Sequence, residues 1–214
     1  NTVLRATDIG FGGGASSVTG TGTLELSPVS ATASIEIGQD DPGQFALDAT
    51  DIAALADGFA GIVVGQPTTG AHAITVGAAS TFTDPLTLEA PVAPGSVAIN
   101  AQLNANEGVT INGSGATTTL AADIVTAGAP IEINDAVVVA ANVQLDTTNG
   151  GGSAGGANVG ITGTTNDFAA GTNTLTLSAG TAGTATLGND VGDSAPLAAL
   201  TINGASVIES VATD

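Results

Sequence analysis

The sequence predicts an all-β chain, and specifically a parallel β-helix (β-solenoid), on two observations. First, short triplets recur in which two apolar residues flank a small or polar residue, often with a turn-forming residue after them. Second, there is no Trp or Tyr and only five Phe, so Val, Ile, Leu and Ala must build the core. Alternation of such residues with polar ones favours strands with one buried face over a bundle of helices.

The triplets run along almost the whole chain, at intervals of 11 or 12 residues between positions 62 and 111. They occupy 24–26, 35–37, 62–64, 74–76, 86–88, 97–99, 109–111, 131–133, 143–145, 159–161, 175–177, 185–187 and 200–202. Strands this short are stable only when both edges are paired, and stacked turns of a coil provide that pairing. We therefore expect coils of roughly 20–24 residues. An antiparallel β-sandwich is the alternative, because its strands recur at similar intervals.

One segment departs from this pattern and has apolar residues at helical spacing. These residues are Ile52, Leu55 and Phe59. Asp48 or Thr50 is suited to cap the N-terminus of a helix, and Gly58 is suited to end it. We expect a short helix near 48–58, within a segment 48–60 that covers the side or end of the coil stack.

The remaining chain divides into two parts. Residues 1–47 are less regular and are expected to form an irregular N-terminal coil or strand layer. Residues 61–214 are expected to form the coils of the β-solenoid. Within them, the Gly-rich run 149–157 has no side chains large enough to bury, so we expect a protruding loop.

The charge balance excludes some partners. Twenty Asp and Glu stand against Arg5 and no Lys, which gives a formal net charge of −19. Such a field opposes binding to nucleic acid or to anionic lipid. No uninterrupted apolar run of about 18 residues is present, so direct membrane insertion is not expected. Because the chain lacks Met, we expect it to be processed or cut from a longer polypeptide.

Several segments carry a resemblance to a known family. Residues 51–59 (DIAALADGF), 62–65 (IVVG) and 81–88 (TFTDPLTL) resemble repeats of very large secreted bacterial surface proteins related to filamentous haemagglutinin. Residues 131–135 (IEIND), 141–145 (ANVQL) and 196–202 (PLAALTI) are similar to coil repeats of that family. The resemblance covers roughly 48–204. It implies a right-handed parallel β-helix, an extracellular or cell-surface location and a role in adhesion, matrix or surface fibre.

Candidate catalytic groups are few. Glu25, Glu36 and Glu132 lie in the middle of triplets, where two-residue alternation points them to a solvated outer face. His72 is the sole imidazole and is interpreted as a residue of a surface turn. Because nucleophilic catalysis needs a base beside a Ser or Cys, we predict no catalytic residue and no enzyme. Neutral-glycan hydrolysis by paired carboxylates stays open as a third possibility.

Calcium is the one cofactor that the sequence leaves open. Asp40 and Asp41 form one weak candidate site, and Asp190 with Asp193 form another. Calcium needs several oxygen ligands, and the sequence contains no EF-hand loop. The alternative is that these residues lie in solvated turns.

These observations favour a structural or adhesive, non-catalytic module of a secreted bacterial surface protein or extracellular filament. Its expected partners are copies of itself or neighbouring modules, stacked end to end. The alternative function is a carbohydrate- or receptor-binding domain whose specificity lies in the loop 149–157 and the segment 48–59.

Overall fold

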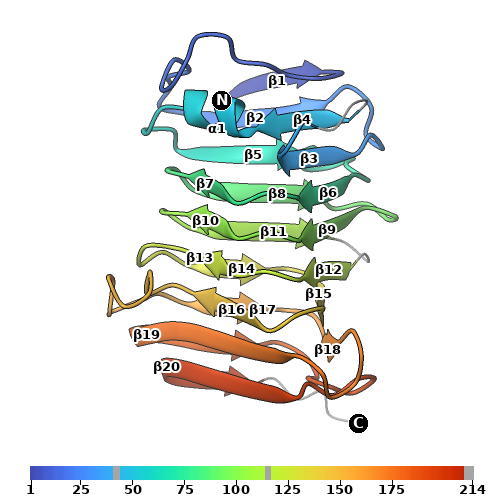
Figure 1. The fold of residues 1–214 in the computed structure, drawn as a ribbon, viewed down its shortest axis with the longest axis vertical. Helices are drawn as coiled ribbons and strands as arrows, with labels where there is room; N and C mark the ends of the chain where they lie inside the picture. Colours follow the sequence, from blue (N-terminus) through green and yellow to red (C-terminus); the bar gives the residue numbers. More distant parts are fainter. Residues whose placement is uncertain (41–43, 114–116, 210–214) are drawn as a thin grey trace.

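The computed structural model describes residues 1–40, 44–113 and 117–209. Its strands form two hydrogen-bonded sheets, of 13 and 7 strands, and the chain winds through them as a parallel β-helix (Figure 1). Neighbouring named strands pair in parallel in both sheets, for example β2 with β5 and β6 with β9. This result confirms the predicted β-helix and rules out the antiparallel sandwich.

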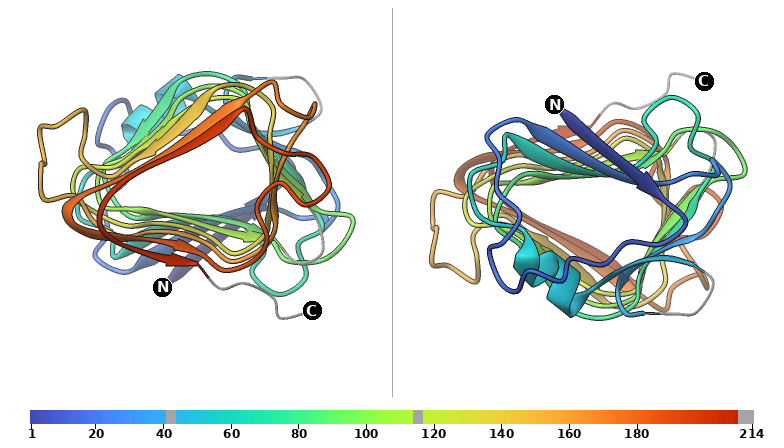
Figure 2. Two further views of the ribbon diagram at one scale, coloured as in Figure 1. Left: turned by 90° about the horizontal axis from the view of Figure 1, so that it is seen from below. Right: turned by 90° about the horizontal axis from the view of Figure 1, so that it is seen from above.

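Three walls of strands enclose the core (Figure 2). The first wall contains β1 (Thr2–Ala6), β2 (Thr23–Pro28), β5 (Gly61–Gly65), β8 (Leu86–Ala90), β11 (Val109–Gly113), β14 (Ile131–Ile133) and β17 (Val159–Ile161). The second wall contains β7 (Ser80–Phe82), β10 (Leu103–Ala105), β13 (Ile124–Val125) and β16 (Val143–Asp146). The third wall contains β4 (Phe45–Asp48), β3 (Ile35–Gly38), β6 (Ala73–Val76), β9 (Ser96–Ile99), β12 (Thr117–Leu120), β15 (Ala136–Val139) and β18 (Thr165–Asp167).

Two long strands join the first and second walls. β19 (Thr174–Leu187) pairs with β16 through its first part and with β17 through its last part, so it passes around the corner between the walls. β20 (Ala199–Glu209) follows β19 along both parts. Together they bring the first two walls into one sheet at the C-terminal end (Figure 1).

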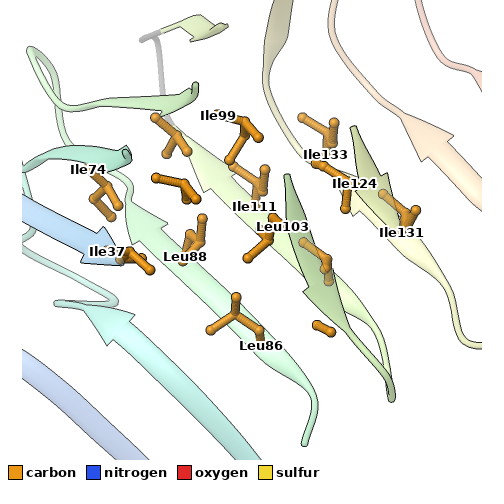
Figure 3. Close-up of a cluster of buried hydrophobic side chains, with 14 of the residues drawn as sticks. Ile37, Ile74, Leu86, Leu88, Ile99, Leu103, Ile111, Ile124, Ile131 and Ile133 are labelled. Carbon is orange, nitrogen blue, oxygen red and sulfur yellow. The ribbon is translucent and has the colours of Figure 1, made fainter. Parts of the chain in front are cut away.

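The core consists of columns of aliphatic side chains. Because successive coils pair in register, each inward residue lies on the inward residue of the next coil. One column in the first wall runs through Leu26, Val64, Leu88, Ile111, Ile133, Ile161 and Leu187. Every member is at most 3% exposed. Figure 3 shows side chains from all three walls that meet in the interior.

The helix α1 (Ala49–Ala54) lies where the sequence places it but is shorter than expected. The carboxylate of Asp48 accepts hydrogen bonds from the backbone N–H groups of Thr50 and Asp51, which confirms Asp48 as the N-cap. The helix ends at Leu55, which takes an extended conformation and forms a parallel bridge with Val18. Pairing with this distant strand segment, rather than a glycine at 58, therefore ends the helix. α1 contacts β7, β3 and β4 at the N-terminal end of the stack (Figure 1).

The first 47 residues contribute regular strands to the solenoid. β1 and β2 extend the first wall, and β3 extends the third. Residues 7–22 link β1 to β2 and run past α1 along the rim of the N-terminal end (Figure 2), and their Ile9, Phe11 and Val18 pack against the core. The Ser16 N–H donates to the carbonyl of Ala53 at 2.9 Å. This contact joins residues 7–22 to α1 at the N-terminal end.

The Gly-rich run 149–157 projects beyond the walls (Figure 2). The carboxylate of Asp146 closes its base, because Oδ1 accepts from the Thr148 N–H at 2.7 Å and Oδ2 accepts from the Gly150 N–H at 2.8 Å. Asn149 has a φ of 52°, a left-handed conformation that the turn requires. Within the described ranges, no helix is long and apolar enough to cross a membrane.

Candidate functional site

His72 lies inside the protein, and its interpretation as a surface-turn residue is wrong. The side chain is fully buried, and its Nδ1 lies 2.8 Å from the carbonyl oxygen of Ala33. Its Nε2 is buried and has no hydrogen-bond partner among the described residues. Gly70 lies against the ring, so a Cβ at that position would crowd the imidazole. Burial lowers the pKa of His72, and the Ala33 carbonyl opposes that shift. The imidazole is therefore a neutral core group out of reach of a substrate.

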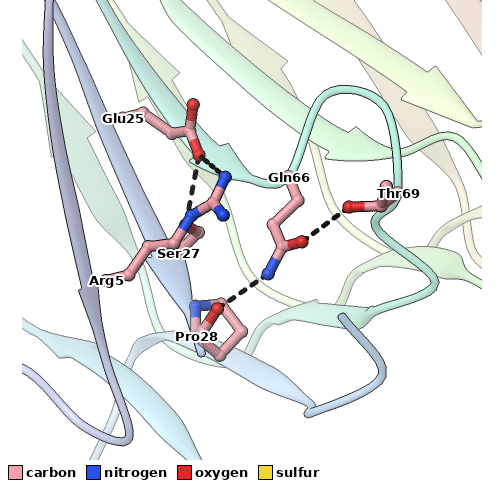
Figure 4. A network of polar contacts seen from close by, with 6 residues as sticks. All are labelled: Arg5, Glu25, Ser27, Pro28, Gln66 and Thr69. Carbon is pink, nitrogen blue, oxygen red and sulfur yellow. Dashed lines mark hydrogen bonds and ion pairs between the residues drawn. The ribbon is translucent and has the colours of Figure 1, made fainter. Parts of the chain in front are cut away.

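The mid-triplet carboxylates do not form one solvated face. Glu25 is partly buried and its Oε1 lies 3.1 Å from the guanidinium of Arg5 (Figure 4). Burial raises the pKa of Glu132. Glu36 is only 5% exposed, which contradicts its expected outward, solvated position. The reason is Gly77 in the next coil, where a Cβ would overlap Glu36 Oε1 and the missing side chain leaves room for the carboxylate.

A second polar contact in Figure 4 is structural. Gln66 is buried, and its Nε2 donates to the carbonyl of Pro28 at 2.8 Å while its Oε1 accepts from the Thr69 hydroxyl at 2.7 Å. The side chain thus joins the end of β2 to the turn after β5. Gln66 is buried in this contact, whereas Thr69 is exposed.

Of the four carboxylates suggested for calcium, three lie among the described residues. Asp40 is exposed beside a hollow at the N-terminal end, and Asp41 lies outside the described residues. Asp193 is exposed, and the backbone carbonyl of Asp190 accepts from the Thr165 N–H at 2.9 Å. Across the described ranges, no three Asp, Glu or His side chains are grouped as metal ligands.

The N-terminal hollow is acidic, and its best-buried carboxylates have structural partners. It has a volume of about 360 Å³ and is lined in part by Asp8, Asp40, Asp48 and Asp51. Asp51 is buried and accepts from the Phe11 N–H at 2.7 Å. Burial raises the pKa of Asp51, and the nearby charges of Asp48 and Asp8 add to the increase. The Asp51 carboxylate thus holds Phe11 against α1.

A polar groove runs along the outer face of the second wall. It crosses β10, β13 and β16, ends at the base of the loop 149–157 and has a volume of about 260 Å³. Its lining residues are Gln102, Asn104, Asp123, Val125, Gln144, Asp146, Asn149 and Gly150. Gln102 donates to Asn104 at 2.8 Å, and Gln144 donates to Ser178 at 3.0 Å. Sequence reasoning missed this groove, although Asn104 and Gln144, in the middle of β10 and β16, were the available signal.

The C-terminal end of the stack exposes apolar side chains at the same register positions that are buried elsewhere. Leu200 pairs with Leu175, and Val207 pairs with Ala185. Leu175 and Ala185 are fully buried, whereas Leu200 is 37% and Val207 is 53% exposed. Ile208 is exposed as well. Among the described strands, β20 pairs only with β19, so its outer edge presents unpaired backbone groups.

The fold and these surfaces define a parallel β-helix with an aliphatic core, a polar groove on one wall and an edge strand, β20, that pairs only with β19 among the described strands. Comparisons of the chain with protein-family models, curated proteins and solved structures find no match. The resemblance to filamentous-haemagglutinin repeats therefore rests on the short motifs alone.

Proposed function

We propose that this chain is a non-catalytic structural or adhesive module of a secreted bacterial surface protein or extracellular filament. The observation that carries the proposal is the outer edge of β20, where Leu200 and Val207 are exposed although their register partners in β19, Leu175 and Ala185, are fully buried. An unpaired edge with apolar inward positions is a template for another parallel strand. The partner that fits it is a further β-helix coil, from a neighbouring module or from another copy of the chain.

Stacking of a further coil would provide partners for the backbone groups of β20 and cover its exposed aliphatic side chains. The backbone groups of β20 gain partners, and the exposed aliphatic side chains are removed from water at about 25 cal/mol per Å². A head-to-tail contact does not close on itself, so repeated stacking gives a filament. The net charge of −19 opposes the approach of copies, and added salt reduces that repulsion.

The test is light scattering and negative-stain imaging of the purified chain across a salt series. We expect association to increase with ionic strength, and Val207→Lys to reduce it by more than about tenfold in apparent association constant. Val29→Lys is the matched control, because Val29 is an exposed valine outside β20. A chain that stays monomeric at every ionic strength, or equal effects of the two variants, would contradict the proposal.

A second function, binding of a carbohydrate or receptor, is favoured by the polar groove beside the loop 149–157. Its amides carry both donors and acceptors, which neutral sugar hydroxyl groups require. Saturable binding to immobilised neutral glycans, lost in Gln144→Ala and kept in Thr110→Ala on the first wall, would support it. No binding to any glycan would leave the structural function as the sole proposal.

A further inference from the structure

A second hollow lies between the turn after α1 and the turn between β7 and β8. It has a volume of about 210 Å³. Its polar lining residues are Ser16, Asp57, Thr81, Thr83 and Asp84, and its apolar side is formed by Ile52, Ala53, Leu55, Ile62 and Phe82. The hollow therefore brings two carboxylates and three hydroxyl-bearing residues from three chain segments to one place.

Asp84 is the unusual residue in this hollow. It is only 2% exposed, and its Oδ1 accepts from the backbone N–H of Gly58 at 2.8 Å. Its Oδ2 is buried and has no hydrogen-bond partner among the described residues. A buried carboxylate oxygen without a partner is costly unless a donor or a cation compensates it.

The chain offers no basic side chain to compensate Asp84. Arg5 and His72 are the only candidates in the whole sequence, which contains no Lys. The Arg5 guanidinium is paired with Glu25, and His72 is buried against Ala33. Neither basic side chain of the sequence therefore compensates Asp84.

We infer that the hollow binds a single calcium ion, with Asp84 and Asp57 as its charged ligands. Carboxylate, hydroxyl, backbone carbonyl and water oxygens are the ligands that calcium accepts, in flexible numbers. The set lacks the thiolate and imidazole ligands typical of zinc. Asp57 directly precedes Gly58, whose N–H is held by Asp84, so one ion would join the turn after α1 to the next coil. This inference is independent of the proposed function.

The test uses the whole chain freed of divalent ions with a chelator. Isothermal titration with CaCl₂ is expected to show one saturable site per chain, and calcium is expected to raise the Tm as a ligand of the folded state. MgCl₂ at equal ionic strength is expected to bind more weakly, because magnesium demands a stricter octahedral geometry. Matched magnesium also controls for general screening of the net charge.

The variants locate the site. Asp84→Asn is expected to weaken calcium binding by more than about tenfold, and Asp57→Asn, which alters an exposed side chain, is expected to weaken it without loss of folding. Asp193→Asn is the control and is expected to bind like the wild type. Absence of a saturable site, or unchanged affinity in Asp57→Asn and Asp84→Asn, would overturn the inference.

Discussion

The imidazole Nδ1 of His72 lies 2.8 Å from the carbonyl oxygen of Ala33, which is 39 residues earlier in the chain. The ring joins the turn before β6 to the turn before β3, and its buried Nε2 has no partner among the described residues. The contact places a titratable group inside the stack, where the described residues form no ion pair with it.

The burial of His72 predicts a loss of stability in mild acid. Because burial lowers its folded-state pKa below the usual 6.5, the unfolded chain binds the proton first. His72 therefore contributes stability above pH 6.5 that is lost as the pH falls toward the folded-state pKa. His72→Gln, which replaces the imidazole N–H donor with an amide N–H donor, should cost about 1–2 kcal/mol at pH 7.5 and abolish this part of the pH dependence. Urea unfolding of both proteins between pH 7.5 and 5 tests it, and parallel curves would contradict it.

Glu132 predicts the opposite dependence. Burial raises its folded-state pKa above the usual 4.5, so the folded chain binds the proton first and stability rises as the pH falls toward 4.5. Glu132→Gln should stabilise the protein at pH 7 by about 0.5–1 kcal/mol, or roughly 1–4 °C in Tm. Glu107→Gln is the control, because Glu107 is exposed and this substitution removes the same charge as Glu132→Gln. A gain in Tm no larger than the control's would refute this account of Glu132.

The hydrogen bonds of Asp167 predict a loss of folding stability in stronger acid. Burial favours a higher pKa, but donors from Asn173, Thr172 and Ala169 outweigh it and hold the pKa of Asp167 at about 2. Its stabilising contribution is therefore present above pH 3.8 and lost as the pH falls toward 2. Asp167→Asn should lower the Tm at pH 5 and flatten the acid limb of the stability curve. Thermal scans from pH 5 to 2 test this, with Asp193→Asn as a control expected to keep the limb.

The Gly-rich loop contains a matched pair of glycines. Gly156 has a φ of 60°, and a Cβ there would overlap the carbonyl oxygen of Ala179 in β19. Gly155 has open space around the same position. Gly156→Ala should cost about 2–3 kcal/mol, and Gly155→Ala should change stability by less than about 0.5 kcal/mol. Equal costs in chemical denaturation would mean that the loop does not pack closely on β19.

The aliphatic columns predict that substitutions at two neighbouring residues of one strand have very different costs in stability. Ile111 is fully buried in the column of the first wall, and Thr110 points to the other face of β11. Ile111→Ala should cost about 3–5 kcal/mol, because the coils above and below hold the cavity open. Thr110→Ala should cost less than about 1 kcal/mol. Similar costs for both variants would show that the register of β11 is wrong.

The strands and the coil repeat can be predicted from the sequence because they depend on the alternation of apolar and polar residues along short segments. In each triplet from 62–64 to 109–111, the two apolar residues predict which face of the strand is buried. Because such strands are too short to be stable alone, they are expected to pair with the equivalent strands of neighbouring coils. The Asp48 cap is also local, since its partners Thr50 and Asp51 lie within three residues.

By itself, then, the sequence determined the parallel β-helix, the position of its helix and the protruding loop. Only the tertiary structure decided which polar residues are buried. Glu36 is enclosed because Gly77 lies beside it, His72 because Ala33 and Gly70 do, and α1 stops at Leu55 because Val18 pairs with it. The physical reason is that strand alternation is set by adjacent residues, whereas burial of a side chain depends on which residue the winding of the chain places against it.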